Sequence, residues 1–132
     1  MKKHYIDIVG KWAFIFAYDI EEKDLGEVGD WLEALGAKPR DIYRAQKVLM
    51  GVNTAFTLNN QNLRMSVMCI GHASSDAQWW DSINHEIDHL QNAIIHYYNV
   101  RHDSEDAAYL QGYIMRKITT VLKSDGYAFG QN

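Results

Sequence analysis

The residues most able to do chemistry lie in one short segment, His85-Glu86-Ile87-Asp88-His89, which has the spacing H-E-x-x-H. Residues four apart lie on one face of an α-helix, separated by about 6 Å along its axis. Two imidazoles at this spacing can bind one zinc ion. The carboxylate beside them can take a proton from a zinc-bound water and return it to a leaving amine. The segment therefore predicts a site for one zinc ion per chain, with His85 and His89 as ligands and Glu86 as the catalytic base and acid.

The sequence around the motif supports a helix. Apolar side chains recur at helical spacing on a face that His85 and His89 do not share, at Ile83, Ile87, Leu90, Ile94 and Tyr97. Ser74, Ser75 or Asp76 can cap the start of this helix, which should run to about Tyr98. The apolar stripe should pack the helix against a core, and the two histidines should face something else.

A peptidase-type zinc site needs a third protein ligand and an open position. The motif, followed by the run Ser104-Glu105-Asp106-Ala107-Ala108-Tyr109, resembles the gluzincin group of zinc metallopeptidases. That resemblance implies Glu105 as the third ligand, with Ala108 as the small residue three positions later. Asp106 and His102 remain alternatives to Glu105. His96 lies about 10 Å beyond His89 along the helix, too far to share the ion.

The sequence is also similar to a group of compact H-E-x-x-H proteins of bacteriophages and Bacteroides-type mobile elements. The similarity covers roughly the second half of the chain, in the stretches 53–57, 83–90 and 104–112. It implies a minimal zincin-like domain with a zinc site, which acts as a metallopeptidase (a hydrolase) on a peptide or protein. The implied alternative is a non-catalytic binding or assembly protein of a phage or mobile element that keeps the zincin scaffold. The intact Glu86 favours the enzyme.

A peptidase also needs a donor for the oxyanion and a surface that holds the substrate, and the sequence offers candidates for both. A donor for the developing oxyanion could come from Tyr109, Tyr113, His102 or Arg116, and the sequence does not choose among them. A substrate peptide could pair with an exposed strand edge. The strand Arg64 to Ile70, directly before the motif helix, is the expected edge, and an ordinary internal strand is the alternative.

Length and composition set the remaining limits. A chain of 132 residues fits one domain, residues 1–132, with a real core. A net charge of −4 without a basic run argues against a nucleic-acid partner. No apolar stretch has the length of a membrane span. The single cysteine, Cys69, excludes an internal disulfide and indicates a packed thiol in a reducing compartment, so the expected location is cytoplasmic.

Periodicity and turn residues predict an α+β fold, with a short, mostly antiparallel sheet packed against helices. The motif helix is followed by the C-terminal helix that bears the third ligand. The expected strands are 5–18, with a turn at 10–11, then 54–58 and 63–70, and the run 12–18 should be a central strand. The expected helices are 30–35, 39–51, 74–98 and 103–123, followed by a loose tail at 124–132.

Overall fold

The structure, a computed structural model, describes residues 1–127 of the chain. Its elements in chain order are β1 (Lys2–Ile8), β2 (Trp12–Tyr18), the short 3₁₀ turn η1 (Glu22–Asp24), α1 (Leu25–Ala34), α2 (Pro39–Leu49), β3 (Ala55–Asn60), β4 (Met65–Ile70), α3 (Asp76–Tyr97) and α4 (Glu105–Ser124). The predicted α+β class is confirmed.

The four strands form one sheet in the order β1-β2-β4-β3. β1 pairs with β2 and β3 pairs with β4 in antiparallel fashion, whereas β2 and β4 run parallel. The sheet is thus mostly antiparallel, as predicted. β2 is buried along nearly its whole length because helices cover both of its faces, which confirms the prediction of a central strand.

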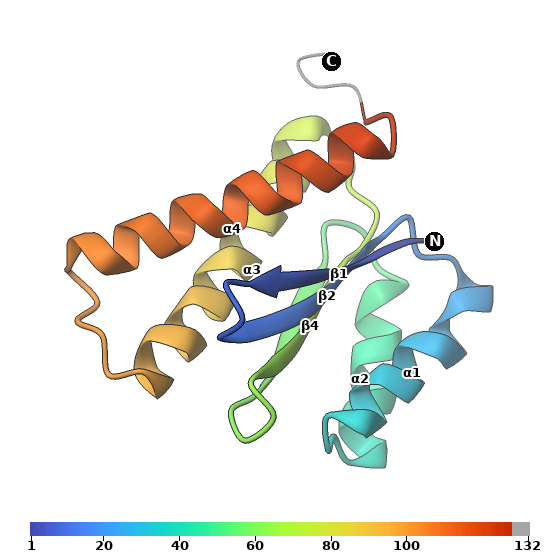
Figure 1. The fold of residues 1–132 in the computed structure, drawn as a ribbon. Helices are drawn as coiled ribbons and strands as arrows, with labels where there is room; N and C mark the ends of the chain where they lie inside the picture. The colour runs from blue at the N-terminus through green and yellow to red at the C-terminus, as the bar shows by residue number, and fades with distance from the viewer. Residues whose placement is uncertain (128–132) are drawn as a thin grey trace.

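Helices lie on both sides of the sheet (Figure 1): α3 and α4 on one face, α1 and α2 on the other. The larger core lies under α3 and α4, and its fully buried members include Phe14, Phe16, Ile83, Ile87 and Ile114. A smaller core lies under α1 and α2, around Val28, Leu32, Leu49, Val67 and Cys69. None of the helices within residues 1–127 is both long and apolar enough to cross a membrane.

Two predicted boundaries need correction. The first helix begins at Leu25 rather than at residue 30. Gly29 does not interrupt this helix but lies where α1 packs closely against α2. A Cβ at Gly29 would lie 2.8 Å from the side-chain nitrogen of Gln46 on α2. The β3–β4 turn falls at residues 61–64, two residues later than expected, and Arg64 takes the positive φ of 52°.

The predicted loose tail is wrong for its first residues. Ser124 ends α4. Asp125 is held at the sheet, where its Oδ2 atom lies 2.6 Å from both the Tyr18 hydroxyl and His4 Nε2. These contacts fix the end of α4 against β1 and β2. Residues 128–132, the rest of that predicted tail, lie outside the described part of the chain.

Candidate metal and peptide site

The motif lies in the middle of α3, as predicted from its flanking residues. Ser75 caps the helix by accepting a hydrogen bond of 3.1 Å from the backbone N–H of Gln78, which satisfies one of the free donors of the first turn. Ile83, Ile87 and other members of the predicted stripe are buried against the sheet. The apolar stripe therefore fixes the rotation of the helix and leaves the histidine face uncovered.

His85 and His89 lie on this exposed face with their imidazoles turned toward one another. Their Nε2 atoms are 3.0 Å apart. Two nitrogen ligands of a tetrahedral zinc ion at the usual bond length are separated by about 3.3 Å. The separation is a hydrogen-bond distance between the two rings, and it is also close to the distance between two ligands of one zinc ion.

Glu86 differs from the two histidines because it is almost completely buried, with 4% of its surface exposed. Its Oε1 atom accepts a hydrogen bond of 2.8 Å from the Thr57 hydroxyl on β3. Burying a carboxylate is costly unless hydrogen bonds compensate for lost water. Thr57 therefore stabilises Glu86 in place and joins the motif helix to the strand beside it.

A groove with a volume of about 770 Å³ runs along the motif between α3 and β3. One wall is the polar face of α3, and the other is β3 together with the residues that precede it. Its lining consists of Val48, Asn53, Thr54, Ala55, Phe56, Thr57, Asn59, Gln78, Asp81, Ser82, Asn84, His85, Glu86, Asp88 and His89. The groove therefore places mostly polar side chains beside His85, Glu86 and His89.

The strand that borders this groove is β3, not the expected strand 64–70. β4 is internal, since it pairs with β2 on one side and β3 on the other, so the alternative of an ordinary internal strand is correct for it. β3 is an edge strand, and all six of its residues are partly exposed. At such an edge, alternate residues direct their N–H and C=O groups away from the sheet.

The structure does not bring Glu105 to the histidines. α4 docks on α3 through Gln91, whose side-chain amide donates a 2.7 Å hydrogen bond to the carbonyl of Ala107. At about 100° per residue, Gln91 lies roughly 120° around α3 from His85 and 160° from His89, so α4 packs on a different face of the helix. Glu105, two residues before Ala107, is exposed there.

The same packing separates the alternative ligands from the motif. Asp106 and His102 are exposed beside Glu105, at the start of α4 and in the link before it. Within residues 1–127, no three His, Cys, Asp or Glu side chains are grouped as metal ligands. The donor set of the described residues thus fits zinc in part, with two histidines and no third protein ligand.

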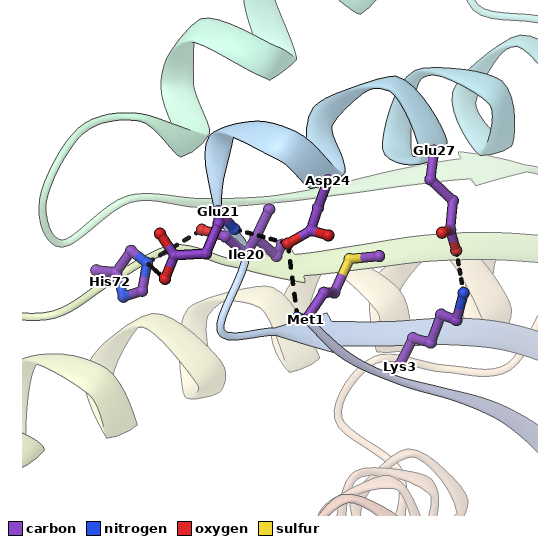
Figure 2. A network of polar contacts seen from close by, with 7 residues as sticks. All are labelled: Met1, Lys3, Ile20, Glu21, Asp24, Glu27 and His72. Carbon is purple, nitrogen blue, oxygen red and sulfur yellow. Dashed lines mark hydrogen bonds and ion pairs between the residues drawn. The ribbon is translucent and has the colours of Figure 1, made fainter.

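The other histidines have separate surroundings. His96 is exposed further along α3, and His4 pairs with Asp125. His72 belongs to a polar network at the start of η1 (Figure 2), where its Nε2 atom lies 3.0 Å from the carbonyl oxygen of Ile20 and 3.5 Å from a Glu21 carboxylate oxygen. None of these three lines the groove.

Neighbouring contacts tie the start of the chain to η1 and α1. The Met1 amine pairs with Asp24 at 3.5 Å, and Lys3 forms an ion pair with Glu27 (Figure 2). These contacts hold β1 and η1 together on the α1 side of the sheet. They contribute to the fold rather than to the groove.

The predicted oxyanion donors are not in the groove either. Tyr109 is 71% exposed on α4. Tyr113 contacts the cationic groups of Arg116 and Lys117 on its own helix. None of the four candidates named from the sequence lines the groove. Thr57, which the sequence analysis did not single out, does line it and contacts Glu86 directly.

Comparison with protein families, with curated proteins and with solved structures finds no match to this chain.

Proposed function

We propose that this protein is a metal-dependent peptidase whose site is centred on His85, Glu86 and His89. The observation that carries the proposal is the 3.0 Å approach of the two histidine Nε2 atoms beside a buried carboxylate in the wall of a groove. Histidine ligands suit zinc well but also admit other divalent ions. When bound, a zinc ion supplies the Lewis acid that polarises the scissile carbonyl and activates water.

The residues of this chain then have separate roles. Glu86 takes one proton from the attacking water as the water oxygen bonds to the carbonyl carbon. It gives that proton to the amine nitrogen as the C–N bond breaks. Thr57 positions Glu86 through its hydrogen bond to Oε1. The free edge of β3 is suited to pair with an extended substrate, which would then lie across the motif.

Glu105 keeps its sequence-based role only if the start of α4 can approach the histidines. Its present position is set by the Gln91–Ala107 contact and by the link of residues 98–104. The third ligand therefore forms a separate part of the proposal, to be tested by its own variant.

A non-catalytic binding protein is the second candidate, and one observation favours it. The described residues hold only two of the three protein ligands that a catalytic zinc site uses. Such a protein would use the same groove and β3 edge to hold an extended segment without cleaving it, in an assembly role of the kind that a phage or mobile-element protein could have.

Turnover separates the two candidates. Purified protein supplied with zinc would be incubated with unstructured protein and peptide libraries, and new termini would be identified by mass spectrometry. We expect cleavage that Glu86→Gln lowers by about 10²–10⁴-fold, while Glu33→Gln, an exposed residue on α1, leaves it unchanged. Cleavage that survives Glu86→Gln would remove Glu86 from the mechanism, and no cleavage at all would favour the binding protein.

A further inference from the structure

The groove carries charge of one sign. Its lining includes the carboxylates of Asp81, Glu86 and Asp88 but no lysine or arginine. Asp81 and Asp88 are exposed on α3, and neither forms an ion pair within residues 1–127. Asp88 accepts a hydrogen bond of 3.4 Å from the side-chain amide of Asn92. Both carboxylates therefore line the groove without a cationic partner among the described residues. An occupant with positive charge would complement them.

The wall of the groove that β3 forms favours an extended polypeptide as the occupant. The free edge of β3 offers backbone donors and acceptors to an extended chain. Asp81 and Asp88 are seven residues apart, or about 10 Å along the axis of α3. Side chains on one face of an extended strand repeat about every 6.6 Å. Two long cationic side chains, two or four residues apart in such a strand, can therefore each approach one of these carboxylates.

From this juxtaposition we propose that the groove selects extended polypeptide segments that carry lysine or arginine. Asp81 and Asp88 are the residues that determine this selectivity. The inference names the substrate class of the site proposed above, so cleavage of such segments rests on the proposed peptidase function. Binding of such segments does not rest on the peptidase function, because it needs only the two carboxylates and the strand edge.

Binding of two synthetic peptides tests the selectivity directly. Each has six residues, matching the length of β3, and a fluorescent label. One alternates lysine with threonine, and the other alternates glutamate with threonine. Fluorescence anisotropy is measured with the intact chain in EDTA, so that cleavage cannot occur. We expect the lysine peptide to bind at least about tenfold more tightly, with an advantage that shrinks as salt is raised.

Variants that remove the two aspartate charges provide a second test in the same binding assay. Asp81→Asn combined with Asp88→Asn should weaken binding of the lysine peptide by about tenfold, as expected for two exposed ion pairs. Asp30→Asn, an exposed aspartate on α1 away from the groove, should leave it unchanged. A lysine peptide methylated on alternate backbone nitrogens should bind weakly, because it can no longer donate hydrogen bonds to the strand edge.

The outcomes distinguish this inference from the peptidase proposal. Equal affinity for both peptides, no binding of either, or no effect of the aspartate variants would overturn the selectivity. Charge-selective binding without cleavage in zinc would leave the selectivity standing and contradict the peptidase. Cleavage of neutral and lysine-containing peptides at equal rates would support the peptidase and contradict the selectivity.

Discussion

Replacing Thr57 with valine should reveal how strongly β3 holds the motif glutamate. The substitution keeps a β-branched side chain on the strand but removes the hydroxyl that donates to Glu86 Oε1 at 2.8 Å. Glu86 is 4% exposed, so water replaces this donor poorly. Hydrogen bonds to charged groups contribute about 1.5–3 kcal/mol, and we expect Thr57→Val to lower the free energy of unfolding by about 2 kcal/mol.

A double-mutant cycle assigns the loss to this one contact. Thr57→Val, Glu86→Gln and the double variant would be unfolded in urea at pH 7 and followed by the fluorescence of the four tryptophans. The interaction between the two sites should be about 1–2 kcal/mol, because the residues are in direct contact. Thr120→Val serves as the control, since this exposed hydroxyl bonds only a helix carbonyl, and it should change stability by less than about 0.5 kcal/mol.

A loss of stability below about 0.5 kcal/mol for Thr57→Val, together with no coupling to Glu86→Gln, would show that Thr57 does not hold the carboxylate. That result would mean that Glu86 is satisfied by water in the groove rather than by Thr57. The proposed positioning role would then fail as well.

Three further substitutions or reactions test the surrounding structure. Gly71→Ala should lower stability by about 1–3 kcal/mol in urea unfolding, because its Cβ would lie 2.8 Å from a backbone carbonyl oxygen; full stability would show that the loop adapts. Burial raises the pKa of the Cys69 thiol, so a thiol reagent at pH 8 should label it only after unfolding, and rapid labelling of the native chain would contradict its position in the core. Burial opposes ionisation of Asp125, but hydrogen bonds from Tyr18 and His4 outweigh it and hold the Asp125 pKa below its usual value. A lowered pKa in the folded state contributes stability above the unfolded value of about 3.9 that is lost as the pH falls through the folded value. Asp125→Asn should therefore destabilise the protein at pH 7, and the difference from the native chain should shrink toward pH 3; a difference that is constant with pH would exclude this linkage.

The elements with regular hydrophobic patterns could be predicted from the sequence. The apolar run 12–18 was correctly predicted as a central strand, and the stripe at Ile83 and Ile87 gave both the extent of α3 and the separate face of its histidines. These patterns succeed because side-chain periodicity directly reflects burial.

Features that depend on contacts between distant residues could not be predicted in this way. Gly29 lies before the predicted first helix 30–35, but it is part of α1, where it packs closely against Gln46 on another helix. The identity of the edge strand depends on the parallel pairing of β2 with β4, which no local pattern specifies. Nothing in the local sequence distinguishes Thr57 from the other residues of its strand, and its contact with Glu86 joins two residues that are 29 positions apart.

The third metal ligand also depends on contacts between distant residues. Glu105 was inferred from a resemblance in sequence order, whereas its position depends on how α4 packs against α3. The Gln91–Ala107 hydrogen bond places the start of α4 on a different face of α3 from His85 and His89. The two ligands within one helix follow from helical geometry alone, but a third from another helix does not.

Whether the histidine pair of α3 binds metal is decided by the zinc content of the purified protein, measured by elemental analysis after dialysis against zinc. We predict about one zinc per chain, lost in His85→Ala and His89→Ala and kept in His96→Ala, the exposed histidine further along α3. Loss in Glu105→Ala as well would show that the start of α4 reaches the site when metal binds, whereas retention would restrict the protein ligands to α3. A native chain that takes up no zinc, or that keeps it in both histidine variants, would contradict the account.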